Sequence, residues 1–167
     1  MGLIIEASVV ESLVSGNYHG DPFAVLGMHQ GENQEGQVCL YIRTLQPQAQ
    51  KVEVIRSDTG QNLGEMRRVH PNGLFQSDMP DEPTFFPYRL KITLYNGQVY
   101  EAEDPYRFLP VLGELDLYLY GEGNHLQIYD KLGAHLMTHQ GVDGVSFAVW
   151  APNCRADASY DGVRPNR

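Results

Sequence analysis

Apolar and polar side chains alternate with a period of two along several short runs of the N-terminal two thirds of the chain, as in half-buried β-strands. The clearest run spans 86–95, and Asn96-Gly97 follows it as a tight-turn signal. Residues 98–102 are therefore predicted to return as the second strand of a hairpin. The apolar face of the first strand carries Tyr88, Leu90, Ile92 and Leu94. Further strands are predicted at 38–43, 51–56, 63–69 and 74–79.

Two other stretches follow a helical period. Ile5, Val9 and Leu13 recur at four-residue spacing, which predicts a short amphipathic helix over residues 4–15. Its apolar stripe must cover either the sheet that follows or a neighbouring domain. A second short helix is predicted over 111–120, where leucines share one helical face.

Short strands joined by Gly- and Pro-containing turns predict an all-β fold, an antiparallel immunoglobulin-like β-sandwich with a short N-terminal helix and a short linker helix. We expect the sandwich to end near a segment that contains two prolines, after which 123–138 is predicted to be an irregular linker and a further strand begins at Val142. The expected segments are an N-terminal helix at 1–16, a β-sandwich at 17–110, a linker with a short helix at 111–140, and the truncated start of a second β-sandwich at 141–167.

The composition narrows the classes of partner. A formal net charge of −9 over 167 residues argues against a nucleic acid and against an anionic membrane surface, whereas a neutral polysaccharide is unaffected. No apolar run is long enough to cross a bilayer. No Lys or Arg precedes Arg43, so the start does not resemble a secretory signal and a cytoplasmic location is expected.

Few residues suggest catalytic or metal chemistry. Cys39 and Cys154 lie far apart in the sequence, and His125, His135 and His139 lack the spacing of a helical zinc site, so no metal is expected. No nucleophile elbow, phosphate loop or dinucleotide-binding turn occurs, so we expect no cofactor and no catalytic residue.

Four stretches resemble, in order, the N-terminal region of bacterial glycogen branching enzymes, which belong to glycoside hydrolase family 13. The stretches are 19–29 (His-Gly-Asp-Pro-Phe-Ala-Val-Leu-Gly-Met-His), 104–108 (Asp-Pro-Tyr-Arg-Phe), 121–135 and 144–153. The residues that carry the resemblance are interpreted as structural, and they are His19, Gly20, Asp21, Pro22, Phe23, Gly27, Asp104, Pro105, Tyr106 and Trp150. The last stretch resembles the opening of a carbohydrate-binding module of family 48, and the resemblance stops near Cys154.

The resemblance implies an enzyme that cleaves an α-1,4-glucan and transfers the chain to form an α-1,6 branch in glycogen. That chemistry needs two carboxyl groups about 5 to 5.5 Å apart, and the family places them on a (β/α)8 barrel. Because such a barrel takes about 250 residues, this chain is not expected to catalyse the reaction by itself. The resemblance implies instead that its β-sandwich influences glucan binding or the length of the transferred chain.

Two alternatives remain open on the sequence alone. The chain could be an autonomous module that binds α-glucan, as glycogen or a malto-oligosaccharide, through Tyr41, Tyr95 and Tyr100, although these could equally be half-exposed strand aromatics. It could also be a purely structural domain that packs against C-terminal domains of the same enzyme, on the barrel of a branching or debranching enzyme. An exposed aromatic row favours the first alternative, and an exposed aliphatic patch favours the second.

Overall fold

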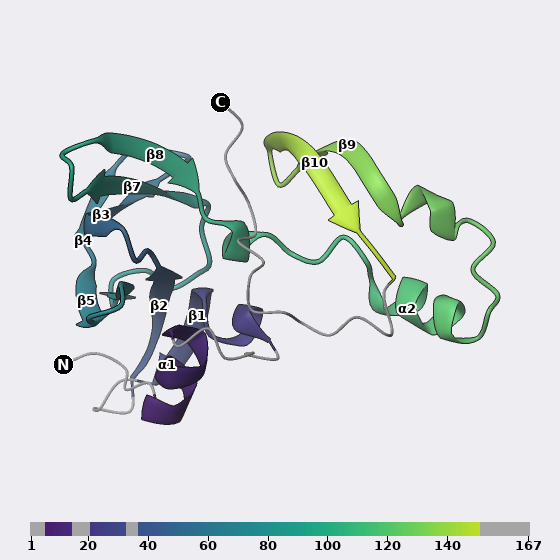
Figure 1. Cartoon of the computed structure of the whole chain (residues 1–167), viewed down its shortest axis with the longest axis horizontal. Helices are drawn as coiled ribbons and strands as arrows, with labels where there is room; N and C mark the ends of the chain where they lie inside the picture. The colour runs from purple at the N-terminus through teal and green to yellow at the C-terminus, as the bar shows by residue number, and fades with distance from the viewer. Residues whose placement is uncertain (1–5, 15–20, 33–36, 151–167) are drawn as a thin grey trace. The chain divides into compact units, whose positions relative to one another are not determined.

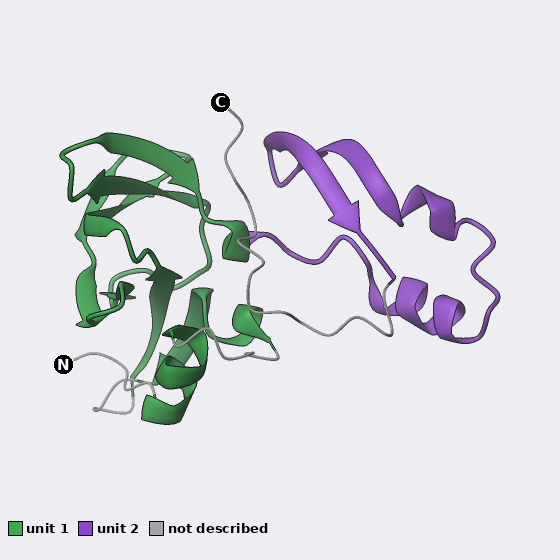
Figure 2. Cartoon of the chain, viewed as in Figure 1, with its two compact units in different colours: residues 1–107, 156–167 green, residues 108–155 purple. Residues whose placement is uncertain are grey.

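The computed structural model describes residues 6–14, 21–32 and 37–150. These residues fall into two compact units, the first within 1–107 and the second within 108–155 (Figure 2). Each unit has its own sheet structure and is described by itself.

Two four-stranded antiparallel sheets form the first unit (Figure 1). The first sheet has the order β1 (Gly27–Glu32), β2 (Val38–Leu45), β6 (Leu74–Met79), β5 (Arg67–His70), and the second has the order β4 (Asn62–Glu65), β3 (Ala49–Arg56), β7 (Tyr88–Leu94), β8 (Val99–Glu103). The chain passes from the second sheet to the first at Met66, which is buried and whose N–H donates to the Val52 carbonyl at 2.8 Å. The predicted all-β sandwich is confirmed.

The core lies between the inner faces of these two sheets. Each sheet contributes alternate side chains, as the period of two requires. The first sheet supplies Met28, Leu40, Ile42, Phe75 and Met79, and the second supplies Ala49, Val52, Val54, Tyr88, Leu90 and Ile92. The predicted apolar face of β7 is confirmed, because Tyr88, Leu90 and Ile92 are each at most 2% exposed.

A second apolar cluster forms in the first unit, where helix α1 (Ala7–Val14) packs against the first sheet. Val10 of α1 is buried with Leu26 and Leu74, and Leu45 and Val69 of the first sheet lie beside them. The helix therefore covers part of the sheet that follows it. Of the two surfaces that its apolar stripe could cover, this sheet or a neighbouring domain, the structure shows the sheet.

The β7–β8 hairpin forms where Asn96-Gly97 predicted it. Gly97 has φ +85° and donates its N–H to the Leu94 carbonyl at 3.0 Å, while the Leu94 N–H donates to the Gln98 carbonyl at 2.8 Å. This is a three-residue loop with glycine in the left-handed position, a common way to join two antiparallel strands.

The second unit contains α2 (Glu114–Gly121), the short 3-10 helix η3 (Ile128–Asp130) and a two-stranded antiparallel sheet of β9 (Gly133–His139) and β10 (Val142–Ala148). Gln140 and Gly141 join these strands with φ values of +49° and +81°, as in a two-residue primed turn. The predicted linker helix is confirmed in α2.

The sequence-based assignment is wrong in three places. Strand β9 begins within 123–138, which is predicted to be irregular, and β1 is not among the predicted strands. The predicted strand 63–69 is two strands, one in each sheet, separated by Met66. Both missed strands are rich in Gly, His or Gln, so their strand conformation follows from pairing with β10 and β2 and not from their own alternation.

Candidate functional site

Two of the motif stretches, separated by about eighty positions, meet in the first unit. Gly27 has φ +93°, and a Cβ atom at this position would lie 2.5 Å from the backbone oxygen of Tyr106. The Phe23 ring packs edge-on against the Tyr106 ring with 5.0 Å between centroids. Glycine is therefore required at position 27 both for its backbone conformation and for the approach of Tyr106.

A buried carboxyl group holds the end of the sandwich. Asp104 has no exposed surface; its Oδ2 accepts from the Tyr88 hydroxyl at 2.6 Å and its Oδ1 from the Tyr106 N–H at 3.0 Å. Burial raises the pKa of Asp104 and also raises the pKa of Tyr88. Asp104 thus ties β7 to the 3-10 helix η2 (Pro105–Arg107), and its carboxyl group lies inside the unit.

The remaining motif residues differ in their surroundings. Asp21 is exposed and precedes the 3-10 helix η1 (Pro22–Ala24), while His19 and Gly20 lie outside the described residues. Trp150, in the second unit, is 61% exposed and its ring contacts the Tyr120 ring edge-on at 4.9 Å. The structural interpretation of these motif residues stays a prediction.

Tyr41 lies in a row of polar side chains on the outer face of the first sheet. Its ring stacks on His29 with 5.6 Å between centroids, and the Arg43 guanidinium lies 4.2 Å from its centroid. Arg43 Nε donates to Gln76 Oε1 at 2.9 Å, and Gln76 Nε2 donates to Asp78 Oδ1 at 2.7 Å. Burial lowers the pKa of Arg43. The Tyr41 ring is therefore part of a network within the domain.

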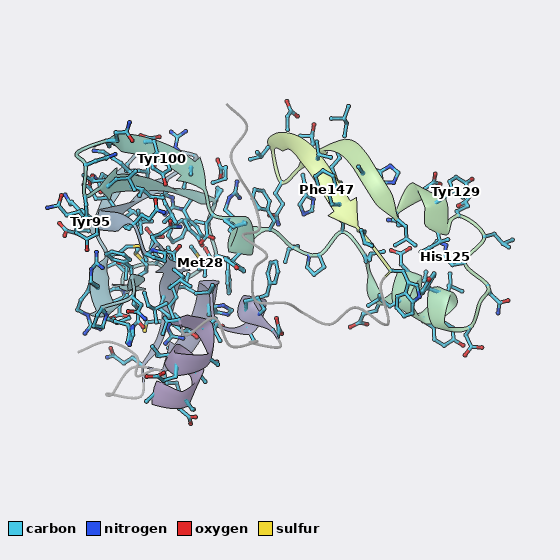
Figure 3. All side chains as sticks on the ribbon, in the orientation of Figure 1. Met28, Tyr95, Tyr100, His125, Tyr129 and Phe147 are labelled. Atoms are coloured by element: carbon cyan, nitrogen blue, oxygen red, sulfur yellow. The ribbon has the colours of Figure 1, made fainter. Side chains whose placement is uncertain are left out.

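Tyr95 and Tyr100 belong to the β7–β8 hairpin and are 65% and 40% exposed. Figure 3 shows both side chains on this hairpin. The structure brings these two residues into one hairpin but does not bring Tyr41 to them, because Tyr41 lies on the outer face of the other sheet. A platform of all three tyrosines does not form.

The described residues include no group of three or more His, Cys, Asp or Glu side chains that could hold a metal ion. The three histidines of the second unit have other partners: His125 binds Asp116, His135 binds the Leu132 carbonyl and His139 binds the Leu109 carbonyl, at 2.8–2.9 Å. Across the part of the chain that the structure describes, no helix is long and apolar enough to span a membrane.

Sequence reasoning missed two features of these sites. The link between Tyr88 and Asp104 joins residues of different elements, and the alternation of β7 showed only that Tyr88 is buried. The contact between Gly27 and Tyr106 is likewise tertiary, and the glycine showed only that an unusual backbone or a close approach was needed.

Two facing sheets, closed at one end by the buried Asp104 and carrying an exposed tyrosine hairpin, define a β-sandwich domain. Residues 6–106 match the family described as alpha-1,4-glucan branching enzyme GlgB, N-terminal domain. The chain belongs to this family, which confirms the resemblance drawn from its motifs.

Curated relatives agree with this assignment. The chain is 48% identical over 147 residues to 1,4-alpha-glucan branching enzyme GlgB of Rhodospirillum rubrum, covering 88% of this chain and 20% of the relative. It is 47% identical to the protein of the same name from Cereibacter sphaeroides, covering 98% of this chain and 22% of the relative. The chain therefore spans about a fifth of the length of these relatives.

Among solved structures, a pullulanase from Paenibacillus barengoltzii complexed with maltotetraose is similar at a TM-score of 0.36 and 20% sequence identity. The match covers 51% of this chain and 12% of that chain. A likeness at this level supports no argument about function.

Proposed function

We propose that this domain serves a glycogen branching enzyme that cleaves α-1,4-glucan and transfers the chain to form α-1,6 branches, and that it influences glucan binding or the length of the transferred chain. The observation that supports this proposal is the family match over residues 6–106. The chain spans about a fifth of the length of its relatives, which are named as the branching enzyme. We place the whole enzyme in cytoplasmic glycogen biosynthesis. The division proposed from the sequence, with a sandwich at 17–110 and a second sandwich beginning at 141, belongs to the same proposal.

The surroundings of Asp104 support a role outside the chemical step. A glycosidic mechanism needs carboxyl groups that a sugar can approach, whereas this carboxyl group is fully buried and bonded to Tyr88 and Tyr106. In the second unit the Asp116 carboxylate is likewise engaged, by His125 at 2.9 Å and Lys131 at 3.6 Å.

The hairpin of the second unit supports a partner within the same enzyme. Leu136 and Val145 are opposite each other in the register of β9 and β10, and Phe147 shares their face. Leu136 is 88%, Phe147 75% and Val149 80% exposed. Figure 3 labels Phe147 on β10. A two-stranded sheet with an uncovered apolar face is marginally stable by itself. We propose that C-terminal domains of the enzyme cover this face.

A domain replacement in the Rhodospirillum rubrum relative tests the proposed role. Deleting the region that matches this chain is expected to shift the distribution of branch lengths that the enzyme makes from amylose, and inserting this chain in its place is expected to restore it. Chromatography of the debranched products measures the distribution. An unchanged distribution in a folded, active deletion variant would overturn the proposal.

A second candidate function is an autonomous module that binds α-glucan. The exposure of Tyr95 and Tyr100 on one hairpin favours it, because aromatic rings at the surface can stack against the apolar faces of sugars. The aliphatic face at Leu136 favours the third candidate, a purely structural domain. The two observations concern different units, the hairpin the first and the aliphatic face the second.

A further inference from the structure

The tip of the β7–β8 hairpin, residues 95–100, is a run of exposed residues that includes no charged residue. All six residues are exposed, and three have large apolar or aromatic side chains. These are Tyr95 at 65%, Val99 at 55% and Tyr100 at 40% exposure. Exposed apolar side chains gathered without charges mark a candidate contact surface.

Hydrogen bonds hold the tip in one conformation. The Gln98 N–H donates to Asn96 Oδ1 at 3.0 Å, and Asn96 Nδ2 donates to Gln98 Oε1 at 3.1 Å, while Gly97 takes the left-handed position. The tip is therefore pre-organised, which lowers the entropic cost of binding a ligand there.

Arg68 braces the Tyr95 ring from the first sheet. Its guanidinium donates to the backbone carbonyls of Ala49 and Pro71 and lies over the Phe75 ring at 4.6 Å from the centroid. The same group lies 5.7 Å from the centroid of the Tyr95 ring. Because an anchored cation supports one side of this ring, the ring is held in place while 65% of the residue stays exposed.

Beside the tip, Arg68 is engaged by two backbone carbonyls, and the charged side chains of β7 and β8 near the tip form ion pairs. On β7 and β8, Arg89 lies 3.1 Å from Glu101, and Lys91 lies 3.7 Å from Glu53. A charged ligand therefore gains little from this surface. A neutral ligand with apolar faces and many hydroxyl groups matches its tyrosine rings and side-chain amides.

We propose that the hairpin tip binds α-glucan, with Tyr95 and Tyr100 stacking on glucose rings and the amides of Asn96 and Gln98 binding sugar hydroxyls. The choice of α-glucan rests on the proposed function, because it follows from the family. Tyr41 is outside this site, since its ring contacts His29 and Arg43 within the domain.

Retardation of the full chain in native gels that contain glycogen, with dextran as the linkage control, tests the assignment. Tyr95→Ala and Tyr100→Ala are each expected to weaken binding about threefold to tenfold, because each removes one stacking ring. Tyr95→Phe is expected to retain most of the binding, since the ring remains.

Tyr129→Ala is the matched control, because Tyr129 is also 65% exposed and lies in the other unit. It is expected to bind glycogen like the unmodified chain. Equal retardation of all the alanine variants would overturn the proposed site and would show that the chain binds glucan at another surface. No retardation of the unmodified chain would overturn the site and the module, while the branch-length experiment would still decide the proposed role in the enzyme.

Discussion

At the scale of single residues, Gly27 is a motif glycine that also makes a close tertiary contact, with the Tyr106 backbone. Gly27→Ala is expected to lower the free energy of unfolding by about 3 kcal/mol or more, because it adds both backbone strain at φ +93° and a clash with the Tyr106 carbonyl. Urea unfolding followed by circular dichroism measures the loss.

Gly60→Ala is the matched control for Gly27. Gly60 has φ +72°, but a Cβ atom there meets nothing within 4 Å. Its replacement is therefore expected to cost only the backbone strain of about 1 kcal/mol. Equal losses in the two variants would show that the approach of Tyr106 contributes nothing.

Asp104 gives stability a defined pH dependence. Since burial raises its pKa in the folded state, the folded protein retains this proton at pH values where the unfolded chain has lost it. The stability from this group is fully present below the ordinary pKa of 3.8 and is lost as the pH rises through the raised pKa. Each unit of elevation corresponds to about 1.4 kcal/mol.

Asp104→Asn removes this titration, because the amide has a similar shape and does not ionise. As the pH rises from acidic to neutral, the free energy of unfolding of the unmodified chain is expected to fall relative to that of the variant. Urea unfolding of both proteins at several pH values measures this difference. A difference that grows in the opposite direction would show that the pKa of Asp104 in the folded protein lies below its ordinary value.

At the scale of elements, helix α1 depends on one apolar stripe and has weak support of its own. It has eight residues, with no acidic residue in its first turn and no basic residue in its last. Short isolated helices are marginal in water, so contact with Leu26 and Leu74 must hold this one in place.

Val10→Asp is expected to lower the free energy of unfolding by about 3 kcal/mol or more, because it places an unpaired charge among Leu26 and Leu74. Ser8→Asp adds the same charge at an exposed position of the same helix and is expected to change stability little. Urea unfolding of the two variants compares them, and equal stabilities would contradict the packing of α1 on the sheet.

Some elements could be predicted from their local sequence. The hairpin at Gly97 and the buried face of β7 follow from turn chemistry and alternation within a few residues. β1 has no such alternation, and it is a strand because its backbone pairs with β2 in continuous register from Gly27 to Glu32.

At the scale of the whole molecule, the two units differ in how completely they bury apolar side chains. The first unit encloses a core between two sheets, whereas the described residues of the second unit include no side chain that is fully buried. The second unit is therefore expected to supply most of the surface that binds the apolar dye ANS.

Phe147→Glu is expected to lower the fluorescence of bound ANS, because it places a charge on the uncovered face of β10. Phe85→Glu is the control, since Phe85 is 62% exposed in the first unit and Phe147 is 75% exposed in the second. An equal drop in both variants would show that the dye does not distinguish the units.

The sequence by itself determined the all-β fold class, the β7–β8 hairpin and the helical segments, because these depend on neighbouring residues. Four ordered motifs also indicated the family. Only the tertiary structure decided which strands pair, that Gly27 lies against Tyr106, and that Asp104 is buried under Tyr88. It also separated Tyr41 from Tyr95 and Tyr100. The physical reason is that pairing between strands and packing between sheets join residues far apart in the chain, and these contacts leave no periodic signal in the segments that make them.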